Sequence, residues 1–209
     1  YYKSMDAITT FIIPTIGRDT LSRALDSVFD QTNPRWKAIV IPDKNPLVEM
    51  PEKYQDARIT YMELEDTKPK GASLTRNRGL QIASTEWVSF LDDDDCVDKN
   101  YVQYLLDHIT EHEQLDAVVF RMRCVRVKIM PEPHCKQLAK FHVGISYSLK
   151  IPFIRQHNIQ FQCCQFEDAE CLLKCKEKGA SILLSKHVVY YVRDASQKHE
   201  EFHDVDLSN

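Results

Sequence analysis

Runs of apolar and β-branched residues, each ending at a polar turn, constrain the fold of this 209-residue chain more than any other feature. They span Ala7–Pro14, Lys37–Ile41 and Trp87–Leu91, and a less regular run covers Ile59–Leu64. Continuous runs of this kind are typical of strands buried on both faces, as in parallel sheets. The sequence therefore predicts buried strands that need helices to cover them.

Helical periodicity fills the intervals between these runs. The segment from Leu21 to Phe29 carries one apolar stripe, and either Asp19 or Thr20 can cap its start. A second helix is expected over Gly71–Ala83. The order strand, helix, strand, strand, helix, strand predicts an α/β domain with a mainly parallel sheet.

The second half of the chain has a different pattern, with weaker periodicity and a proline-containing segment. We expect a loop over Lys128–Lys140 and a polar, mobile tail after Arg193. The regular elements expected here are helices over Lys99–His112 and Asp168–Lys178, a long strand over Ala117–Val127, and two short strands over Ser181–Leu184 and Val188–Val192.

Composition excludes several classes of protein. A net charge of −4 offers no field for a polyanion, so nucleic-acid binding is disfavoured. No run approaches the ~18 apolar residues of a membrane span. The seven scattered cysteines fit reduced thiols, and we expect a soluble, cytoplasmic protein. The spacing of the five glycines excludes the P-loop and the dinucleotide-binding motif.

Four consecutive aspartates, Asp92 to Asp95, directly follow the run that ends at Leu91. Open α/β sheets bind ligands at the carboxyl ends of their strands, where this cluster is expected. Adjacent carboxylates raise one another's pKa unless a cation neutralises them. Their hard oxygens suit Mg²⁺ or Mn²⁺, and a diphosphate can complete the coordination. We infer a metal-bound nucleotide, with a solvated acidic turn as the alternative.

Five short segments, in order along the chain, resemble the motifs of glycosyltransferase family 2. They are TFIIPT at 10–15, VIPD at 40–43, GASLTRNRGL at 71–80, WVSFLDDDD at 87–95 and FED at 166–168. The resemblance covers most of the chain and implies the GT-A fold, an α/β fold with a mixed, mainly parallel sheet flanked by helices. It implies one domain over 1–209, with a Rossmann-like nucleotide-sugar half at about 7–98 and an acceptor half at about 99–209.

The resemblance also implies a nucleotide-sugar site. Thr15 and Arg18 would line the nucleotide pocket, and Asp43 would accept a hydrogen bond from N3 of uracil. Arg76 would lie beside the pyrophosphate, where its fixed fork can bind phosphate oxygens in pairs, unless it is a surface arginine.

The same resemblance assigns the metal to the aspartate cluster. Asp92 and Asp93 would contact the ribose or the metal, and Asp94 would hold Mn²⁺ or Mg²⁺ against both phosphates. Many relatives carry a histidine after the last strand that can reach the metal. This sequence has Asp194 at the comparable place, so the last metal ligand stays open.

Asp168 matches the acidic position that acts as base in inverting members of the family. Such a base deprotonates the acceptor hydroxyl as it attacks the anomeric carbon. Glu167 or Glu170 can be the base instead, and an acidic first turn favoured by the helix dipole is a further alternative.

Other polar and aromatic residues weigh less. His108 and His112 lack the metalloprotease pattern and are expected to face solvent on a helix. Arg121, Arg123 and Arg126 alternate along a strand, where they can meet an anionic ligand or line an exposed face. By the resemblance, the acceptor region includes Phe141, His142, Tyr147 and Phe161, whose rings suit sugars.

We therefore expect a metal-dependent, inverting transferase that moves a sugar from a UDP-sugar to a hydroxyl of a glycan or glycoprotein. One alternative is a nucleotidyltransferase, which releases pyrophosphate instead of a nucleoside diphosphate. The other is a module of a longer polypeptide that binds the donor without activity of its own.

Overall fold

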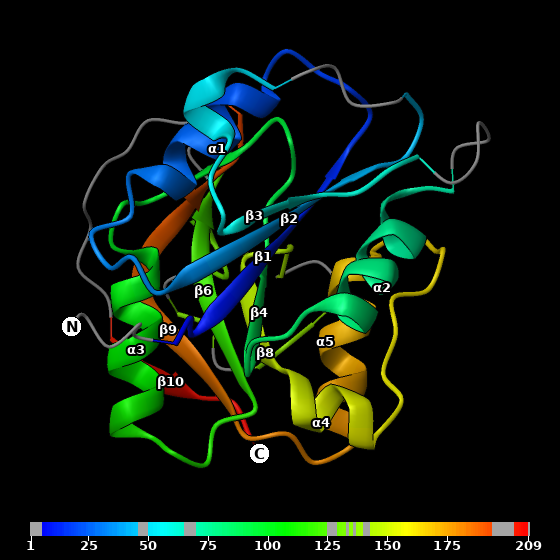
Figure 1. Cartoon of the computed structure of the whole chain (residues 1–209). Coiled ribbons are helices and arrows are strands. Elements are labelled where there is room, and N and C mark those ends of the chain that lie inside the picture. The colour runs from blue at the N-terminus through cyan, green and yellow to red at the C-terminus, as the bar shows by residue number, and fades with distance from the viewer. Residues whose placement is uncertain are drawn as a thin grey trace.

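The structure is a computed structural model that describes residues 6–45, 50–64, 70–124, 129–132, 134–135, 137–139, 143–193 and 203–208. Helices and strands alternate in its first half (Figure 1). Its strands are β1 Thr9–Thr15, β2 Trp36–Pro42, β3 Ile59–Tyr61, β4 Trp87–Phe90, β5 Cys96–Val97, β6 Ala117–Arg123, β7 Ile129–Met130, β8 Tyr147–Lys150, β9 Ile182–Tyr191 and β10 Val205–Asp206. Its helices are α1 Leu21–Phe29, α2 Ala72–Ile82, α3 Tyr101–Glu111, α4 Ile151–Gln156 and α5 Glu167–Glu177, with a 3₁₀ turn η1 at Glu52–Tyr54.

The described strands form one sheet, ordered β10-β9-β6-β8-β4-β1-β2-β3, with β5 beside β9 and β7 beside β6. Strands β3, β2, β1 and β4 are all parallel. The order along this half is 3-2-1-4, so the chain leaves β1 toward β2 and later returns to the other side of β1 as β4. Their carboxyl ends lie at one edge, at the point where α/β sheets bind ligands.

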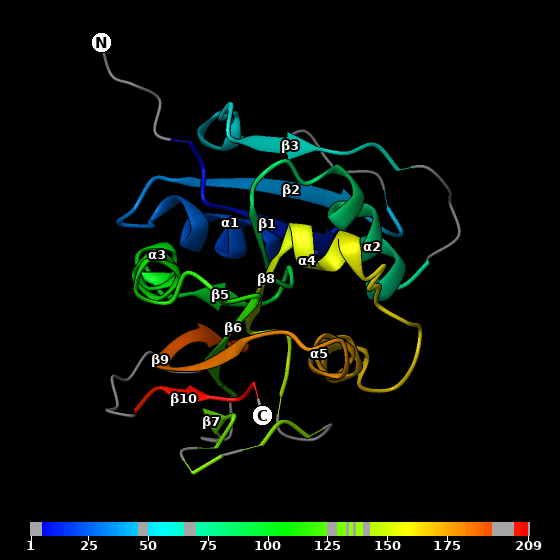
Figure 2. The ribbon, with the colours of Figure 1, turned by 90° about the horizontal axis from the view of Figure 1, so that it is seen from below.

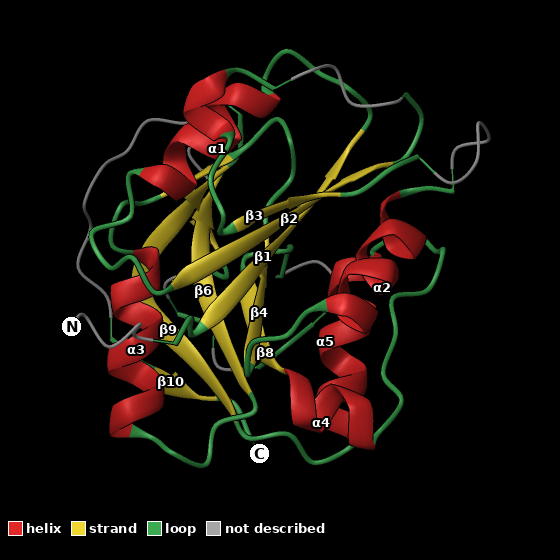
Figure 3. Ribbon diagram, in the orientation of Figure 1, coloured by secondary structure: helices red, strands yellow, loops and turns green. Residues whose placement is uncertain are grey.

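Helices cover both faces of the sheet (Figure 3). Helices α1 and α3 lie on one side and α2, α4 and α5 on the other, and the view from below shows the same division (Figure 2). Burial explains the arrangement, because the apolar stripe of α1 is buried at Leu21, Ala24, Leu25 and Val28. The predicted α/β class, with a mixed sheet flanked by helices, is confirmed.

Several local predictions were wrong. Thr20 precedes α1 without a side-chain capping bond. The two short strands expected near the end are one strand, β9, whose pairing with β6 is irregular between Val119 and Met122. Part of the expected loop forms β7, and part of the expected tail forms β10. Strands β5 and β8 and helix α4 were not predicted.

The expectation that the arginines of β6 line an exposed face of the strand was also wrong. Arg121 and Arg123 are buried, at 0% and 2% exposed, so they do not line an exposed face; Arg126 lies outside the described residues. Arg121 donates through Nη1 to the carbonyls of Pro131 and Glu132, at 2.8 and 2.9 Å. His108 does not face solvent either, because it is 4% exposed and lies 2.8 Å from Oγ of Ser185.

None of the helices in the described part of the chain is both long and apolar enough to cross a membrane. All seven cysteines carry free thiols. Cys171 and Cys175 are both buried on α5, where they pack as small apolar side chains.

Candidate active site

A cavity of about 340 Å³ opens at the carboxyl edge of the parallel strands. The eight residues assigned from the sequence all line it, although they come from five separate segments of the chain. The lining comprises Pro14, Thr15, Ile16, Arg18, Asp43, Ala72, Arg76, Asp92, Asp93, Asp94, Glu167, Asp168 and Arg193.

Asp93 holds the turn that follows β1. Its Oδ2 accepts a 2.6 Å hydrogen bond from Oγ1 of Thr15 and a 3.2 Å bond from the amide of Ile16, and its Oδ1 pairs with Arg18. The residue is 1% exposed. Asp93 and Thr15 therefore fix the turn in place, while Arg18, whose side chain is 45% exposed, reaches the cavity.

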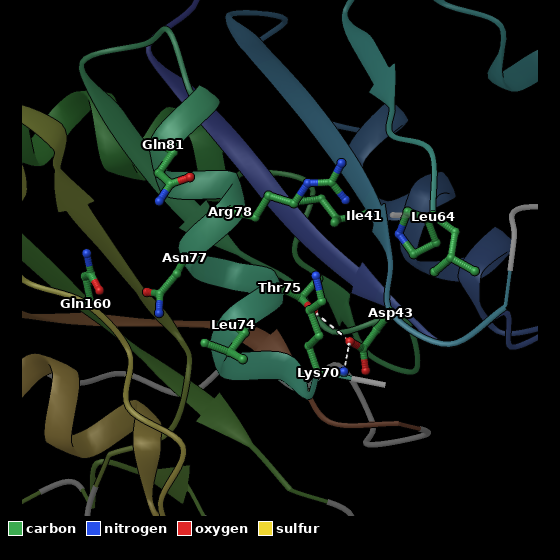
Figure 4. A pocket seen from close by; sticks show the side chains of 11 residues that line it. Ile41, Asp43, Leu64, Lys70, Leu74, Thr75, Asn77, Arg78, Gln81 and Gln160 are labelled. Carbon is green, nitrogen blue, oxygen red and sulfur yellow. Dashed lines mark hydrogen bonds between the residues drawn. The ribbon is translucent and has the colours of Figure 1, made fainter. Parts of the chain in front are cut away.

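Asp43 ties the end of β2 to the start of α2 (Figure 4). Its Oδ1 accepts hydrogen bonds from the amide of Lys70 at 2.8 Å, the amide of Gly71 at 3.1 Å and Oγ1 of Thr75 at 3.1 Å. Gly71 has φ +84°, a conformation that favours glycine. Among the described residues, Oδ2 receives the longer bond from Gly71, at 3.2 Å, and a carboxylate oxygen has capacity for another donor.

A second cavity, of about 280 Å³, adjoins the first and shares Asp43 as a wall residue. Arg78 and Leu74 of α2, Ile41 at the end of β2 and Leu64 line it (Figure 4). It contains none of the four consecutive aspartates, so the acidic chemistry of the edge belongs to the first cavity.

Arg76 lies between carboxylates from two distant parts of the chain. Its Nη2 donates to Oδ1 of Asp92 at 2.7 Å, and its Nη1 donates to Oδ1 of Asp168 at 2.8 Å and lies 3.5 Å from Oε1 of Glu167. The side chain is 3% exposed, which excludes the surface arginine. Arg76 thus joins the aspartate cluster to the first turn of α5.

Asp168 occupies a partly buried position in that first turn, with its side chain 25% exposed. Burial raises the pKa of this carboxyl to about 6, although Arg76 opposes the shift, and Asp92 and Glu167 add to it. A carboxyl with such a pKa can accept a proton near neutral pH. Glu167 lines the same cavity, whereas Glu170 is not among the residues that line it.

The remaining aspartates of the cluster differ in environment. Asp94 is 23% exposed in its side chain, and its Oδ2 lies 3.9 Å from Arg18 and 3.5 Å from Nε of Arg193. Asp95 is 4% exposed and accepts a 2.8 Å bond from the amide of Arg193, and burial raises its pKa to about 6. Arginines thus supply part of the positive charge that four adjacent carboxylates require.

Asp92 and Asp94 are the two members of the aspartate cluster that are not buried. Both side chains are partly exposed in the cavity. Among the described residues, no group of three His, Cys, Asp or Glu side chains is placed to hold a metal. The donor set fits Mg²⁺ or Mn²⁺ held by one or two carboxylates together with phosphate oxygens. Asp194 lies outside the described residues.

The expected acceptor region is only partly described. Tyr147 and Phe161 are 0% and 2% exposed, so these two rings of the expected region are core residues. Phe141 and His142 lie outside the described residues. Sequence reasoning missed Arg193 as a cavity residue, although its position two residues after the last long strand was a usable signal.

Comparison with known proteins agrees with this geometry. The model of glycosyl transferase family 2 matches residues 10–166. The putative teichuronic acid biosynthesis glycosyltransferase TuaG of Bacillus subtilis is 32% identical over 110 residues, which are 50% of this chain and 42% of TuaG. Glycosyltransferase GlyA of Streptococcus pneumoniae serotype 4 is 32% identical over 119 residues, 54% of this chain and 17% of GlyA. The chain therefore spans less than half the length of both relatives.

Solved structures share the fold. Residues 1–349 of TarS from Staphylococcus aureus, in complex with UDP, superpose with a TM-score of 0.77 at 21% identity, covering 89% of this chain and 60% of that one. The mannosyltransferase PcManGT from Pyrobaculum calidifontis, in complex with GDP-Man and Mn²⁺, gives a TM-score of 0.67 at 16% identity, covering 95% of this chain and 59% of that one.

The family match spans β1, the end of β2, the start of α2 and the aspartate cluster, which supply most of the cavity lining. It ends directly before Glu167, so Glu167, Asp168 and Arg193 line the cavity from outside the matched range. With its sheet, its cavity and its sequence in agreement, the chain belongs to glycosyl transferase family 2 and has the GT-A fold.

Proposed function

We propose that this chain binds a UDP-sugar and Mn²⁺ or Mg²⁺ and transfers the sugar, with inversion, to a hydroxyl of a glycan. The observation that carries the proposal is the meeting of two kinds of carboxylate in one cavity. Partly exposed Asp92 and Asp94 face it from the end of β4, and Asp168 faces it from α5 with a pKa raised to about 6 by burial.

The donor half of the cavity would be formed by the turns after β1, β2 and β4. Asp43 would accept the N3 proton of uracil on its Oδ2, and Thr15 would support the turn that contacts the nucleotide. Arg18 is exposed enough to reach a phosphate. Complexes of TarS with UDP and UDP-GlcNAc support this choice of nucleotide.

The metal site would use Asp94, Asp92 and the phosphates of the donor. When bound, the cation supplies positive charge that stabilises the departing nucleoside diphosphate. Among the described residues, the ion pairs of the Asp94 carboxylate are 3.5 Å or longer, which supports its assignment to such a ligand. The presence of Mn²⁺ in the PcManGT complex supports the choice of metal.

Asp168 would act as the base. Its carboxylate would take the proton from the acceptor hydroxyl as that oxygen attacks the anomeric carbon from the face opposite the leaving nucleotide. The bond from carbon to phosphate oxygen breaks as the new glycosidic bond forms. Burial favours proton uptake, because a carboxyl with a pKa near 6 is a stronger base than a solvated aspartate.

Thermal melting tests the donor site directly. UDP, CDP, GDP and UDP-sugars are compared with and without Mn²⁺, because a ligand at ~100 times its Kd stabilises by ~2.7 kcal/mol. We expect the largest shift with UDP or a UDP-sugar together with Mn²⁺. If none of the nucleotides shifted the melting temperature, with or without Mn²⁺, this result would contradict the proposal.

Product analysis separates the two alternatives from the proposal. A glycosyltransferase releases UDP, whereas a nucleotidyltransferase releases pyrophosphate. A donor-binding module would show the melting shift but neither transfer nor hydrolysis of the donor. Slow release of UDP from UDP-GlcNAc or UDP-glucose by the chain alone would exclude that module.

A further inference from the structure

Arg76 contacts both Asp92, in the donor half of the cavity, and Asp168, the proposed base. Its Nη1 and Nη2 are engaged by Asp168 and Asp92, at 2.8 and 2.7 Å. Its guanidinium also lies 5.5 Å from the centre of the ring of Phe161. A planar fork that bonds two carboxylates is fixed in orientation, in contrast to a single ammonium group.

Asn77, the residue after Arg76, binds the start of the segment from 161 to 168, which ends at Asp168. Nδ2 of Asn77 donates to the carbonyl of Phe161, and the amide of Phe161 donates to Oδ1 of Asn77, both at 2.8 Å. Consecutive residues of α2 therefore hold both ends of the stretch from 161 to 168. The hydroxyl of Tyr147 holds the backbone carbonyl of Asp168 at 2.9 Å.

We propose that Arg76 is a positioning residue, which orients the carboxylate of Asp168 toward the acceptor and couples its placement to Asp92 in the donor half. This inference rests on the proposed function, because it takes Asp168 as the base. It assigns to Arg76 a task different from binding the pyrophosphate. Both terminal nitrogens are engaged by carboxylates, and the side chain is 3% exposed.

The positive charge of Arg76 also stabilises the carboxylate of Asp168 in this position. Among the described residues, the groups that act on Asp168 are Arg76, the carboxylates of Asp92 and Glu167, and the phenol of Tyr147, which contacts its backbone carbonyl. Arg76 is the positive group among them and opposes the rise in the pKa of Asp168, whereas both carboxylates add to it. Loss of Arg76 would free the side chain of Asp168 to rotate and would raise its pKa further.

The test uses the whole chain with Arg76→Gln and Arg76→Lys, beside Arg58→Gln as the control. Arg58 also pairs with an aspartate, Asp56 at 2.8 Å, but it lies outside the cavity lining. UDP affinity is measured calorimetrically with Mn²⁺, and UDP release from UDP-GlcNAc or UDP-glucose gives kcat and KM from pH 5 to 9. Melting confirms that each variant is folded.

We expect Arg76→Gln to lower kcat by ~100-fold, in the range of a misplaced base. Its UDP affinity should change by less than about threefold, and the acid limb of its pH profile should move up by about 1 unit. Arg76→Lys keeps the charge but not the fork, so it should retain the position of the acid limb and lose about tenfold in kcat.

Two results would overturn the inference. One is wild-type kcat in Arg76→Lys. The other is an Arg76→Gln variant that loses UDP affinity while its kcat and acid limb stay unchanged, which identifies a phosphate ligand. A wild-type chain that binds no UDP is a different outcome, because it refutes the proposed function itself. If Arg76→Gln does not fold, Arg76→Lys decides alone.

Discussion

The hydroxyl of Tyr147, at the start of β8, donates a 2.9 Å hydrogen bond to the backbone carbonyl of Asp168 in the first turn of α5. Phe166, which precedes that helix, has φ +69°, a left-handed conformation that is uncommon for an aromatic residue. These two features set the direction in which α5 begins. They place the backbone of Asp168 independently of its side chain, which Arg76 orients.

Replacement of Asp168 by asparagine should remove transfer and spare donor binding. The amide cannot accept the proton of the acceptor hydroxyl, so we expect kcat to fall by about 10²–10⁴-fold. UDP affinity with Mn²⁺ should stay within about threefold of the wild-type value, because a base acts after the donor has bound. Steady-state kinetics and calorimetry on one preparation measure both quantities.

The matched control is Glu170→Gln, which changes an acidic residue in the same helical turn that does not line the cavity. Full transfer by Asp168→Asn would place the base elsewhere, with Glu167 as the next carboxylate to test. In the wild type, activity should decline as the pH falls through about 6, because protonated Asp168 cannot accept a proton.

Replacement of Asp94 by asparagine should remove the effect of Mn²⁺ on UDP binding. The variant keeps the shape of the side chain but loses the charge that we assign to the metal. We expect the UDP affinity of the variant with Mn²⁺ to equal that of the wild type without Mn²⁺. Asp30→Asn, an exposed aspartate after α1, is the control. An Mn²⁺ response like that of the wild type would assign the metal to other ligands.

The parallel half of the fold could be predicted because each of its strands is apolar along its whole length and ends at a polar turn. Ile12 pairs with Ile39 on one side and with Phe90 on the other, and all three are buried. Strands that are apolar along their whole length lie inside a parallel sheet that helices cover on both faces. The topology then places their carboxyl ends at one edge of the sheet. This is why the residues assigned to the turns after β1, β2 and β4 lie in one cavity.

The second half of the fold could be predicted only in part, because its burial does not follow composition. Tyr147 is buried on β8, and Arg121 is fully buried with its Nη1 bonded to two backbone carbonyls. Long-range pairing decides these environments, and a single sequence does not reveal it. Similarly, the contact of Arg76 with Asp168 joins residues 92 positions apart, and no local pattern indicates it.

The histidine on β9 should make stability depend on acid. Burial, followed by nearby His108, lowers the pKa of His187 to about 4, and its ring stacks on Tyr104 at 3.6 Å. A histidine with a lowered pKa in the folded state stabilises the protein above its unfolded pKa of about 6.5, and this contribution disappears as the pH falls toward 4. Between pH 7 and pH 4 the wild type loses unfolding free energy. We expect His187→Phe, which keeps a stacking ring, to lose about 2 kcal/mol less of it over the same range.

Urea unfolding at pH 7, 5.5 and 4 measures this difference. The carboxylates are the same in both proteins, so their common acid sensitivity cancels in the comparison. An equal loss of unfolding free energy in both proteins would place the acid-sensitive group elsewhere. Tyr104→Phe keeps the stacked rings and the histidine, and it should therefore follow the wild type.

Gly79 on α2 should resist replacement by alanine, although alanine is the better helix former. A Cβ atom at this position would lie 2.5 Å from Cγ2 and 2.9 Å from Cγ1 of Ile12, in the centre of β1. Alanine in a helix normally stabilises by about 0.5–1 kcal/mol relative to glycine, but overpacking costs about 1–3 kcal/mol. We expect a net loss in unfolding free energy for Gly79→Ala, measured by urea titration.

Ile12→Ala removes the opposing atoms, so the double variant should lose less unfolding free energy than the sum of the losses of the two single variants. Gln81→Ala, exposed on the same helix, should change the unfolding free energy by no more than about 0.5 kcal/mol. A stabilised Gly79→Ala would show that α2 can move away from β1 at no cost. That freedom would also contradict the rigid placement of Arg76, one turn earlier on the helix.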